Sequence, residues 1–309
     1  MNLVIIGLGV QGRKRLAMAG AEVVATVDPT VPTATYDELE QVPLDSFEAA
    51  CVCTPDQTKL GLVRYLLAHG KHVLVEKPLF AADLGSLRAL IQLAQASGVA
   101  CYTAYNHRFE PHIARLKTIM DSERLGTVYL VRGFYGNGTA VDIACSPWRD
   151  QGAGVLSDLG SHLLDLVLLL FGEPKGRFER WSANRFETRA FDHALFGVSG
   201  RPAFELEATF VSWRNTFTLD VYGERGSVHL DGLCKWGPSL LTVRQRVWPS
   251  GRPTEEIFRV EGPDPTWALE YDDFKRLCQA GQTNLANDLW ISSVLHELAE
   301  PVHQEACSS

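Results

Sequence analysis

The sequence predicts an α/β chain of two domains: a parallel sheet covered by helices, then an α+β domain built on an open, mostly antiparallel sheet. Up to about residue 120, short apolar runs alternate with helical stretches, which is typical of a parallel sheet with both faces covered. Beyond it, strand-like segments follow one another closely and are separated by Gly, Pro or Asn turns, which indicates an antiparallel sheet. With 309 residues, the chain is long enough for two ordinary domains.

The predicted first domain, 1–120, contains five buried strands. The expected strands cover 3–6, 22–28, 48–54, 72–76 and 99–105, and the expected helices cover 11–20, 57–69 and 81–97. The segment 29–43 is rich in Pro and Thr, so it is expected to be mostly loop rather than a helix.

The predicted second domain, 121–309, has a different pattern. Its expected strands cover 128–136, 204–213, 215–223, 227–232 and 240–248, and its expected helices cover 154–171, 265–280 and 285–299. The two terminal helices could pack back on the first domain.

Composition and charge exclude several classes of function. A formal net charge of −8 argues against nucleic-acid binding, which needs a basic surface. The N-terminus lacks the features of a signal peptide, and the longest apolar run, near 163–171, is too short to cross a membrane. The seven cysteines and nine histidines are scattered, which predicts reduced thiols, a cytoplasmic location and no metal site.

A dinucleotide-binding motif follows the first strand. Gly7, Gly9 and Gly12 form GxGxxG, and the motif opens a helix, as a Rossmann domain requires. Gly7 permits a tight turn, Gly9 lets a pyrophosphate approach the backbone, and Gly12 lets helix and strand pack closely. Asp28 ends the second strand, where a carboxylate binds ribose hydroxyls and repels a 2′-phosphate. No basic residue follows directly, so NAD is favoured over NADP.

A second cluster, 76-EKPLF-80, lies at the end of the strand 72–76. Ligands bind at this edge of an open α/β sheet, so Lys77 is placed to donate to a substrate hydroxyl. Pro78 cannot extend the strand, and a cis bond before it would turn the chain. The alternative is an ordinary solvated lysine in a loop.

Taken in order, GLGVQG, VEKPL, YNHRF and WRDQGAGVLSDLGSHLLDL resemble segments of the Gfo/Idh/MocA oxidoreductases. The resemblance implies a Rossmann domain followed by an α/β domain on an open sheet. It also implies hydride transfer between NAD and a secondary alcohol or ketone of a sugar, cyclic polyol or nucleotide sugar.

The resemblance carries site residues over to matching positions. It implies that Lys77, Asp158 and His162 are catalytic. The implied cofactor-binding residues are Gly7, Gly9, Val10, Gln11, Gly12, Asp28, Thr54, Pro55, Glu76, Lys77 and Asn106. The implied substrate-binding residues are Lys77, Arg108, Trp148, Arg149, Asp158 and His162. Two departures stand out: the segment after Asp28 is short, and the family's frequent TPNxxH reads 54-TPDQTK-59, which puts contacts from that loop in doubt.

The helix expected at 154–171 places Asp158 and His162 four residues apart on one face. Histidine is the usual general base near neutral pH, so we expect His162 to take the carbinol proton and Asp158 to tune it. Lys77 would stabilise the same oxygen, and Asp165 is expected to be structural. A surface Asp–His pair of little consequence is the alternative.

Other interpretations stay open. A catalytically silent NAD-binding regulator, a reductase of a non-carbohydrate carbonyl or enone, and internal-redox hydrolysis of a glycosidic bond are compatible with the same fold. A homodimer or homotetramer is expected to form through an uncovered apolar face of the second sheet, with Phe204, Phe210, Trp213 and Phe217 in or near it.

Overall fold

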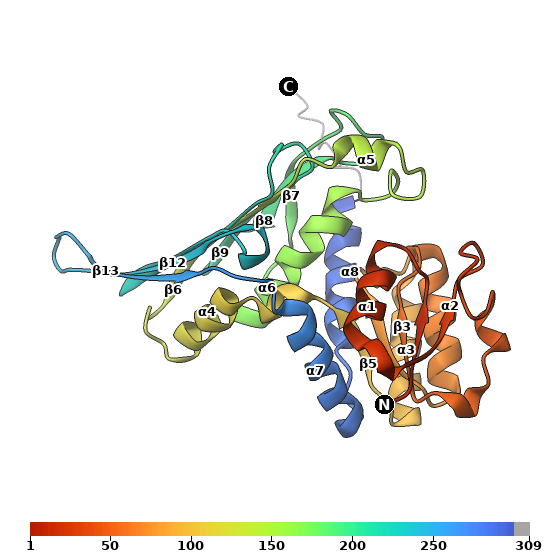
Figure 1. The fold of residues 1–309 in the computed structure, drawn as a ribbon. Coiled ribbons are helices and arrows are strands. Elements are labelled where there is room, and N and C mark those ends of the chain that lie inside the picture. Colours follow the sequence, from red (N-terminus) through yellow and green to blue (C-terminus); the bar gives the residue numbers. More distant parts are fainter. Residues whose placement is uncertain (300–309) are drawn as a thin grey trace. The chain divides into compact units, whose positions relative to one another are not determined.

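The computed structural model describes residues 1–299, so Cys307 and His303 lie outside the described residues. The chain divides into two compact units (Figure 1). Unit 1 contains Met1–Phe109 and Pro265–Ser292; unit 2 contains Glu110–Asp264 and the described residues after Ser292.

The division differs from the predicted boundary at residue 120. Helix α4 (Pro111–Asp121) belongs to unit 2, where the His112 ring nitrogen Nε2 lies 3.1 Å from the carbonyl oxygen of Ser239. Just before this helix, Glu110 accepts a hydrogen bond from the backbone N–H of Cys234. These two long-range contacts tie α4 to the second sheet, and neither can be recognised from local periodicity.

Unit 1 is a doubly wound parallel sheet. Its strands are β1 (Leu3–Ile6), β2 (Val23–Val27), β3 (Ala49–Val52), β4 (His72–Glu76) and β5 (Cys101–Ala104), in the spatial order β2-β1-β3-β4-β5. Its helices are α1 (Val10–Ala19), α2 (Asp56–Ala68), α3 (Leu84–Ser97), α7 (Thr266–Ala280) and the start of α8 (Leu285–Ala299). All neighbouring strands run parallel. The order reverses at β1, so the carboxyl ends of β1 and β3 flank the position where such sheets bind ligands.

The two faces of this sheet explain why its strands are continuous apolar runs. Alternate residues of β1 enter two separate cores: Val4 and Ile6 pack with residues of α2 and α3, and Leu3 and Ile5 pack with α1 and α7. Phe274 of α7 is fully buried in the second of these cores. Every strand residue therefore meets apolar neighbours, as a sheet covered on both faces requires.

No α-helix connects β2 to β3, as the Pro- and Thr-rich segment predicted. Two short 3-10 turns, Leu39–Gln41 and Leu44–Ser46, are its only helical elements. The chain instead returns along β2, where Thr35 and Thr26 exchange backbone and side-chain hydrogen bonds. This return covers the edge strand of the sheet.

Unit 2 is built on a mixed, mostly antiparallel sheet of eight strands. They are β6 (Val128–Gly136), β7 (Glu179–Asn184), β8 (His193–Val198), β9 (Ala203–Thr209), β10 (Thr216–Gly223), β11 (Gly226–Asp231), β12 (Ser239–Gln245) and β13 (Thr254–Val260). The spatial order is β13-β12-β11-β10-β6-β9-β8-β7, and only the β6–β9 pair is parallel. Sequence periodicity missed β7, β8 and β13, as well as the helices α4 and α5 (Ala140–Ala144).

One face of this sheet is covered by α4 and α6 (Ser161–Phe171) (Figure 1). Phe204, Phe210 and Phe217 are at most 1% exposed, so the expectation that they form an uncovered apolar face is wrong. Trp213 is exposed but lies in the turn before β10. These phenylalanines are needed on the inner face, where they fill the space between sheet and helices.

The outer face of the same sheet is more polar. Arg132 on β6 pairs with Glu205 on β9 at 2.6 Å, and Asp220 on β10 lies 2.8 Å from His229 on β11. The strand registers align these four residues in one row across the sheet. No helix in residues 1–299 is long and apolar enough to cross a membrane.

Candidate active site

The glycine-rich turn after β1 has the geometry that the motif predicts. Gly7 has a φ of +88°, and a Cβ there would lie 2.7 Å from the carbonyl oxygen of Cys53. A Cβ at Gly12 would lie 1.8 Å from the carbonyl oxygen of Gly7, so only glycine lets α1 approach the strand this closely. A Cβ at Gly9 would meet no atom within 4 Å, which leaves its backbone open to a ligand. The first N–H groups of α1 have no partners within the helix, and this arrangement fits a pyrophosphate.

The Asp28 carboxylate accepts several hydrogen bonds near this turn. Its Oδ2 accepts a hydrogen bond of 2.8 Å from the backbone N–H of Leu8, and its Oδ1 accepts from the N–H groups of Thr30 and Val31. The Thr30 hydroxyl donates to the same Oδ1 at 2.8 Å. Burial by itself would raise the pKa of Asp28, but these hydrogen bonds outweigh it and hold that pKa below its usual value. The carboxylate therefore stays charged at the end of β2, with Oδ2 the less heavily used acceptor.

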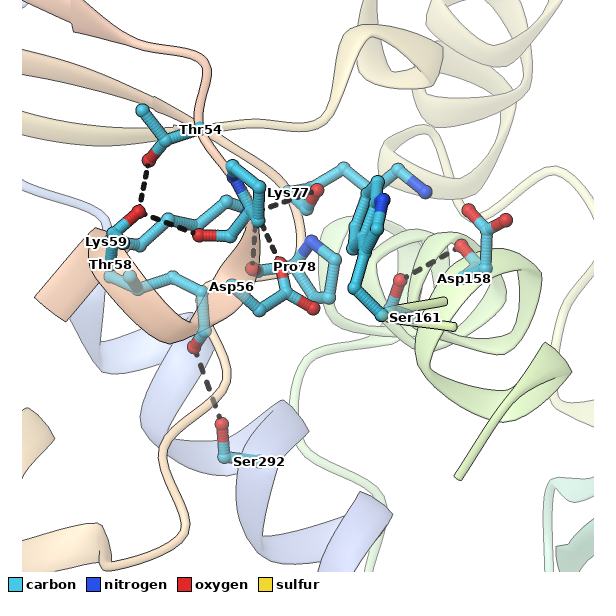
Figure 2. A network of polar contacts seen from close by, with 12 residues as sticks. Thr54, Asp56, Thr58, Lys59, Lys77, Pro78, Asp158, Ser161 and Ser292 are labelled. Carbon is cyan, nitrogen blue, oxygen red and sulfur yellow. Dashed lines mark hydrogen bonds and ion pairs between the residues drawn. The ribbon is translucent and has the colours of Figure 1, made fainter. Parts of the chain in front are cut away.

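The EKP turn begins where β4 ends, at Glu76. The Glu76 carboxylate pairs with the buried Arg15 of α1 at 2.8 Å, so the cofactor helix and the EKP turn are tied together. The Lys77–Pro78 peptide is cis, as the sequence suggested. The ammonium of Lys59 donates to the carbonyl oxygens of Lys77 and Pro78 (Figure 2). The backbone of this turn is thus fixed while the Lys77 side chain keeps partial exposure.

Other predicted cofactor residues lie around the same sheet edge. Thr54, which follows β3, has its methyl 3.1 Å from the position of a Gly7 Cβ. Its hydroxyl accepts a hydrogen bond from Thr58 at 2.9 Å (Figure 2). Pro55 is the residue before α2. Val10 is 73% exposed at the start of α1, where Gln11 is exposed as well.

Asn106 and Arg108 lie in the 3-10 turn after β5, Asn106–Phe109. The Asn106 amide donates to the Thr266 hydroxyl of α7 at 2.8 Å, and both residues are in unit 1. Both predicted side chains are partly exposed, whereas His107 between them is buried. The turn therefore leaves Asn106 and Arg108 partly exposed and buries the histidine between them.

In unit 2, the helix that carries Asp158 and His162 is not α-helical throughout. Residues Leu156–Gly160 form a π-helical turn, and the α-helix α6 begins only at Ser161. The expectation of one α-helix over 154–171 is therefore wrong at its N-terminal end. The wider turn changes the spacing of side chains between Asp158 and His162. Such π-helical turns inside helices are often found at functional sites.

The three titratable groups of this helix have different surroundings. The Asp158 carboxylate is about one-third exposed (32%) and lies 3.6 Å from the guanidinium of Arg149. His162 is 6% exposed and packs against the ring of Tyr135, with a centroid separation of 5.8 Å. Asp165 is fully buried. Burial raises the pKa of Tyr135, and the negative charge of Asp158 raises it further, so the phenol stays protonated as a neighbour of His162.

Trp148 and Arg149 lie in a loop that is anchored by the next residue. The Asp150 carboxylate accepts hydrogen bonds from the backbone N–H groups of Arg189 and Ala190 at 2.7 and 2.8 Å. Trp148 is 48% exposed, which leaves a large aromatic surface available to a ligand. The sequence signalled the WR pair but not the role of Asp150 in holding it.

Sequence reasoning also missed an aromatic cluster beside His162. Trp236 and Phe217 each have ring centroids 5.8 Å from that of Tyr135. Trp236 is only partly buried, and the ammonium of Lys235 lies 4.6 Å from its centroid. The sequence placed Tyr135 and Phe217 in predicted strands and Trp236 between two of them, and such placement does not reveal their partners.

No group of three or more His, Cys, Asp or Glu residues within 1–299 is arranged to hold a metal ion. The six cysteines in this part of the chain are not in disulfides.

Two domain models of one family match the chain. The model of an oxidoreductase family with an NAD-binding Rossmann fold matches residues 1–105, and the GFO/IDH/MocA C-terminal domain model matches residues 113–229. The chain therefore belongs to the Gfo/Idh/MocA family of NAD-binding oxidoreductases, which confirms the resemblance seen in its motifs.

Individual relatives agree with this family. The chain is 27% identical to bovine (Bos taurus) trans-1,2-dihydrobenzene-1,2-diol dehydrogenase over 68% of its own length and 62% of the relative's. It is 30% identical to the uncharacterized oxidoreductase YdgJ of Escherichia coli (strain K12), over 58% of the chain and 52% of that protein. Each match thus spans less than two thirds of the relative. A levoglucosan dehydrogenase in complex with NADH has the same fold, with a TM-score of 0.83, 18% identity and coverage of 96% and 95% of the two chains.

Proposed function

We propose that this protein is an NAD-dependent dehydrogenase or reductase that acts on a secondary alcohol or ketone of a sugar, cyclic polyol or related ring compound. The observation that carries the proposal is the Lys77 turn at the carboxyl edge of the parallel sheet. Arg15 ties it to the helix of the dinucleotide motif through Glu76. A lysine that directly follows a residue paired with this helix is suited to act on the oxygen of a substrate that reacts with the cofactor.

The proposed roles follow from the chemistry of each side chain. Bound NAD⁺ supplies the acceptor for the hydride that leaves the carbinol carbon. His162 accepts the hydroxyl proton, so the C–H and O–H bonds break and a C=O bond forms. Lys77 donates a hydrogen bond to the same oxygen and stabilises its developing negative charge. Asp158 hydrogen-bonds the substrate and tunes His162. In the reverse direction His162 returns the proton.

The substrate class rests on the polar and aromatic side chains of unit 2. Arg149, Asp158 and Trp148 are all partly exposed, and they offer donors, an acceptor and a flat apolar surface. A polyhydroxylated ring presents hydroxyl groups at its edge and C–H groups on its face, so it suits such a set. The bovine relative is named for a ring diol, which supports the same class. Asp165 is assigned a structural role because it is buried.

The test is a panel of sugars, cyclic polyols and nucleotide sugars screened for NADH formation, with the corresponding ketones screened in the reverse direction. Once a substrate is found, Lys77→Ala and His162→Ala should each lower kcat by ~10²–10⁴-fold, the usual contribution of acid–base groups. The matched controls are Lys175→Ala and His69→Ala, since both residues are exposed. The controls should keep wild-type turnover.

Binding of NAD is measured separately by thermal shift and titration calorimetry. All four variants should bind NAD within about threefold of wild type, because none removes the glycine turn or Asp28. Unchanged turnover in either Lys77→Ala or His162→Ala would contradict the assigned role. Tight NAD binding with no turnover of any compound in either direction would instead favour a non-catalytic NAD-binding regulator.

We also propose that the protein forms a homodimer or homotetramer through the outer face of the unit 2 sheet. The support is the row of alternating acidic and basic side chains, Glu205, Arg132, Asp220 and His229, which is complementary to an inverted copy of itself. Sedimentation velocity should give the mass of an oligomer that weakens in Arg132→Glu. A monomeric mass for the wild type would refute this assembly.

A further inference from the structure

The first turn of α2, which follows β3, holds a buried lysine that the resemblance to the family does not explain. Lys59 stands where the family's frequent motif has histidine, and it is only 3% exposed on α2. A lysine is rarely buried this fully, because removing an ammonium from water is costly unless it is paired and hydrogen-bonded. Its partners therefore indicate what it does.

All three N–H donors of the Lys59 ammonium have acceptors (Figure 2). Nζ lies 2.7 Å from Oδ1 of Asp56, 3.0 Å from the carbonyl oxygen of Pro78 and 3.3 Å from that of Lys77. Asp56 is the first residue of α2, and its side chain is 44% exposed. The Asp56 carboxylate thus balances the charge of the Lys59 ammonium, and the other two hydrogen bonds hold the backbone of the EKP turn.

The two carbonyl groups need such a donor. β4 ends at Glu76, so the next residues have left the hydrogen-bond ladder of the sheet. The residues on either side are already held: Glu76 by Arg15, and Leu79 by Ser292, whose hydroxyl lies 3.5 Å from the Leu79 carbonyl oxygen (Figure 2). Lys59 binds the carbonyl groups of the two residues between them, Lys77 and Pro78.

We propose that Lys59, with Asp56 as its counter-ion, is a positioning residue that fixes the backbone from which Lys77 reaches the substrate. The inference rests on the proposed role of Lys77. Lys59 does not itself touch the substrate, because its three donors are used within the turn. Its effect is on the step that Lys77 assists, and the binding of NAD is left nearly unchanged.

The test compares Lys59→Met with wild type. Methionine keeps the apolar length of the side chain and removes all three donors. We expect kcat to fall by ~10–100-fold, the effect of a displacement of about an ångström at a catalytic group, while KM for NAD changes by less than about threefold. Hydrogen exchange read by mass spectrometry should be faster in the peptide that covers residues 76–82. This readout needs neither substrate nor cofactor.

Two further variants complete the experiment. Asp56→Asn keeps the lysine and an oxygen acceptor for it but removes the counter-charge, so it should lower kcat by a smaller factor of about 2–10. Lys117→Met removes one member of an exposed Lys–Asp pair on α4 and should change neither kcat nor exchange at 76–82.

The outcomes separate this inference from the proposed function. If wild type turns over a substrate and Lys77→Ala does not, but Lys59→Met keeps kcat within twofold or leaves exchange at 76–82 unchanged, the positioning role is overturned. It is also overturned if the loss of activity in both Lys59→Met and Asp56→Asn matches the fraction of unfolded protein. If wild type turns over nothing in the panel, the proposed function fails, and the exchange data still decide whether Lys59 holds the turn.

Discussion

Replacing Arg15 by methionine should destabilise unit 1 severely. Arg15 is 1% exposed, and its guanidinium pairs with Glu76 at 2.8 Å and with Glu270 of α7 at 2.6 Å. Burial would lower the pKa of Arg15, but the two carboxylates raise it, so the group is charged in the folded protein. The indole ring of Trp267 lies 4.3 Å from the guanidinium carbon. Three parts of unit 1, namely α1, the EKP turn and α7, therefore meet at one cation.

The expected loss follows from the two carboxylates that the substitution leaves behind. Glu270 is fully buried and Glu76 is 9% exposed, so neither can regain full hydration. Removing one partner of a buried ion pair costs about 3–5 kcal/mol of the free energy of unfolding. The triple variant Arg15→Met, Glu76→Gln, Glu270→Gln removes the stranded charges and should recover most of that loss.

The assay is urea unfolding followed by tryptophan fluorescence, with hydrogen exchange to show that α1 and α7 are the helices that loosen. Arg244→Met is the control, because its pair with Glu255 is exposed, and it should cost less than about 1 kcal/mol. A loss of less than about 1 kcal/mol for Arg15→Met, or a triple variant as unstable as the single one, would refute the reasoning.

Three further predictions concern the cofactor turn and the thiols. Asp28→Asn places an amide N–H₂ against backbone donors, so it should cost about 1–3 kcal/mol of stability and reduce the preference for NAD over NADP in titration calorimetry. Because the folded pKa of Asp28 is lowered, its stabilising effect is present above about pH 4 and is lost as the pH falls, a dependence that the variant should lack. Gly12→Ala should weaken NAD binding at least tenfold, since its Cβ would meet the Gly7 carbonyl, and Gly61→Ala on the open face of α2 should not. In thiol labelling with a chromogenic disulfide near neutral pH, exposed Cys145 should react first of the six cysteines within residues 1–299. Cys51 should react only on unfolding, because burial raises its pKa to about 12.

These predictions have clear contrary outcomes. Unchanged selectivity between NAD and NADP in Asp28→Asn would remove Asp28 from the cofactor site. Equal NAD affinity in Gly12→Ala and Gly61→Ala would mean that the close approach of α1 to the Gly7 turn is unimportant. Rapid labelling of Cys51 in the native protein would show that the first sheet opens more readily than its buried core indicates.

Much of unit 1 follows from local sequence patterns. Apolar runs of four or five residues, glycines at fixed spacing and an acid at the end of the second strand are short-range signals. Each acts within one strand–turn–helix unit, so the amino-acid sequence alone suffices to place the glycine turn, Asp28 and the EKP turn. In unit 2, hydrophobic periodicity did not predict β7, β8 and β13. β7 and β13 are the two edge strands of their sheet and have no fully buried residue, so their apolar alternation is weak.

The sequence alone is enough to identify the family, the parallel sheet and the set of residue types at the candidate site. Which side chains pair depends on the folded chain. Arg15 and Glu270 are 255 residues apart, and the contact between Lys59 and the EKP turn spans 18 and 19 residues. The π-helical turn before His162 and the burial of Phe204, Phe210 and Phe217 likewise depend on what packs against them. A local pattern of apolar and polar residues indicates which side of one segment is buried and which is exposed. These pairings depend instead on chain segments that folding brings together.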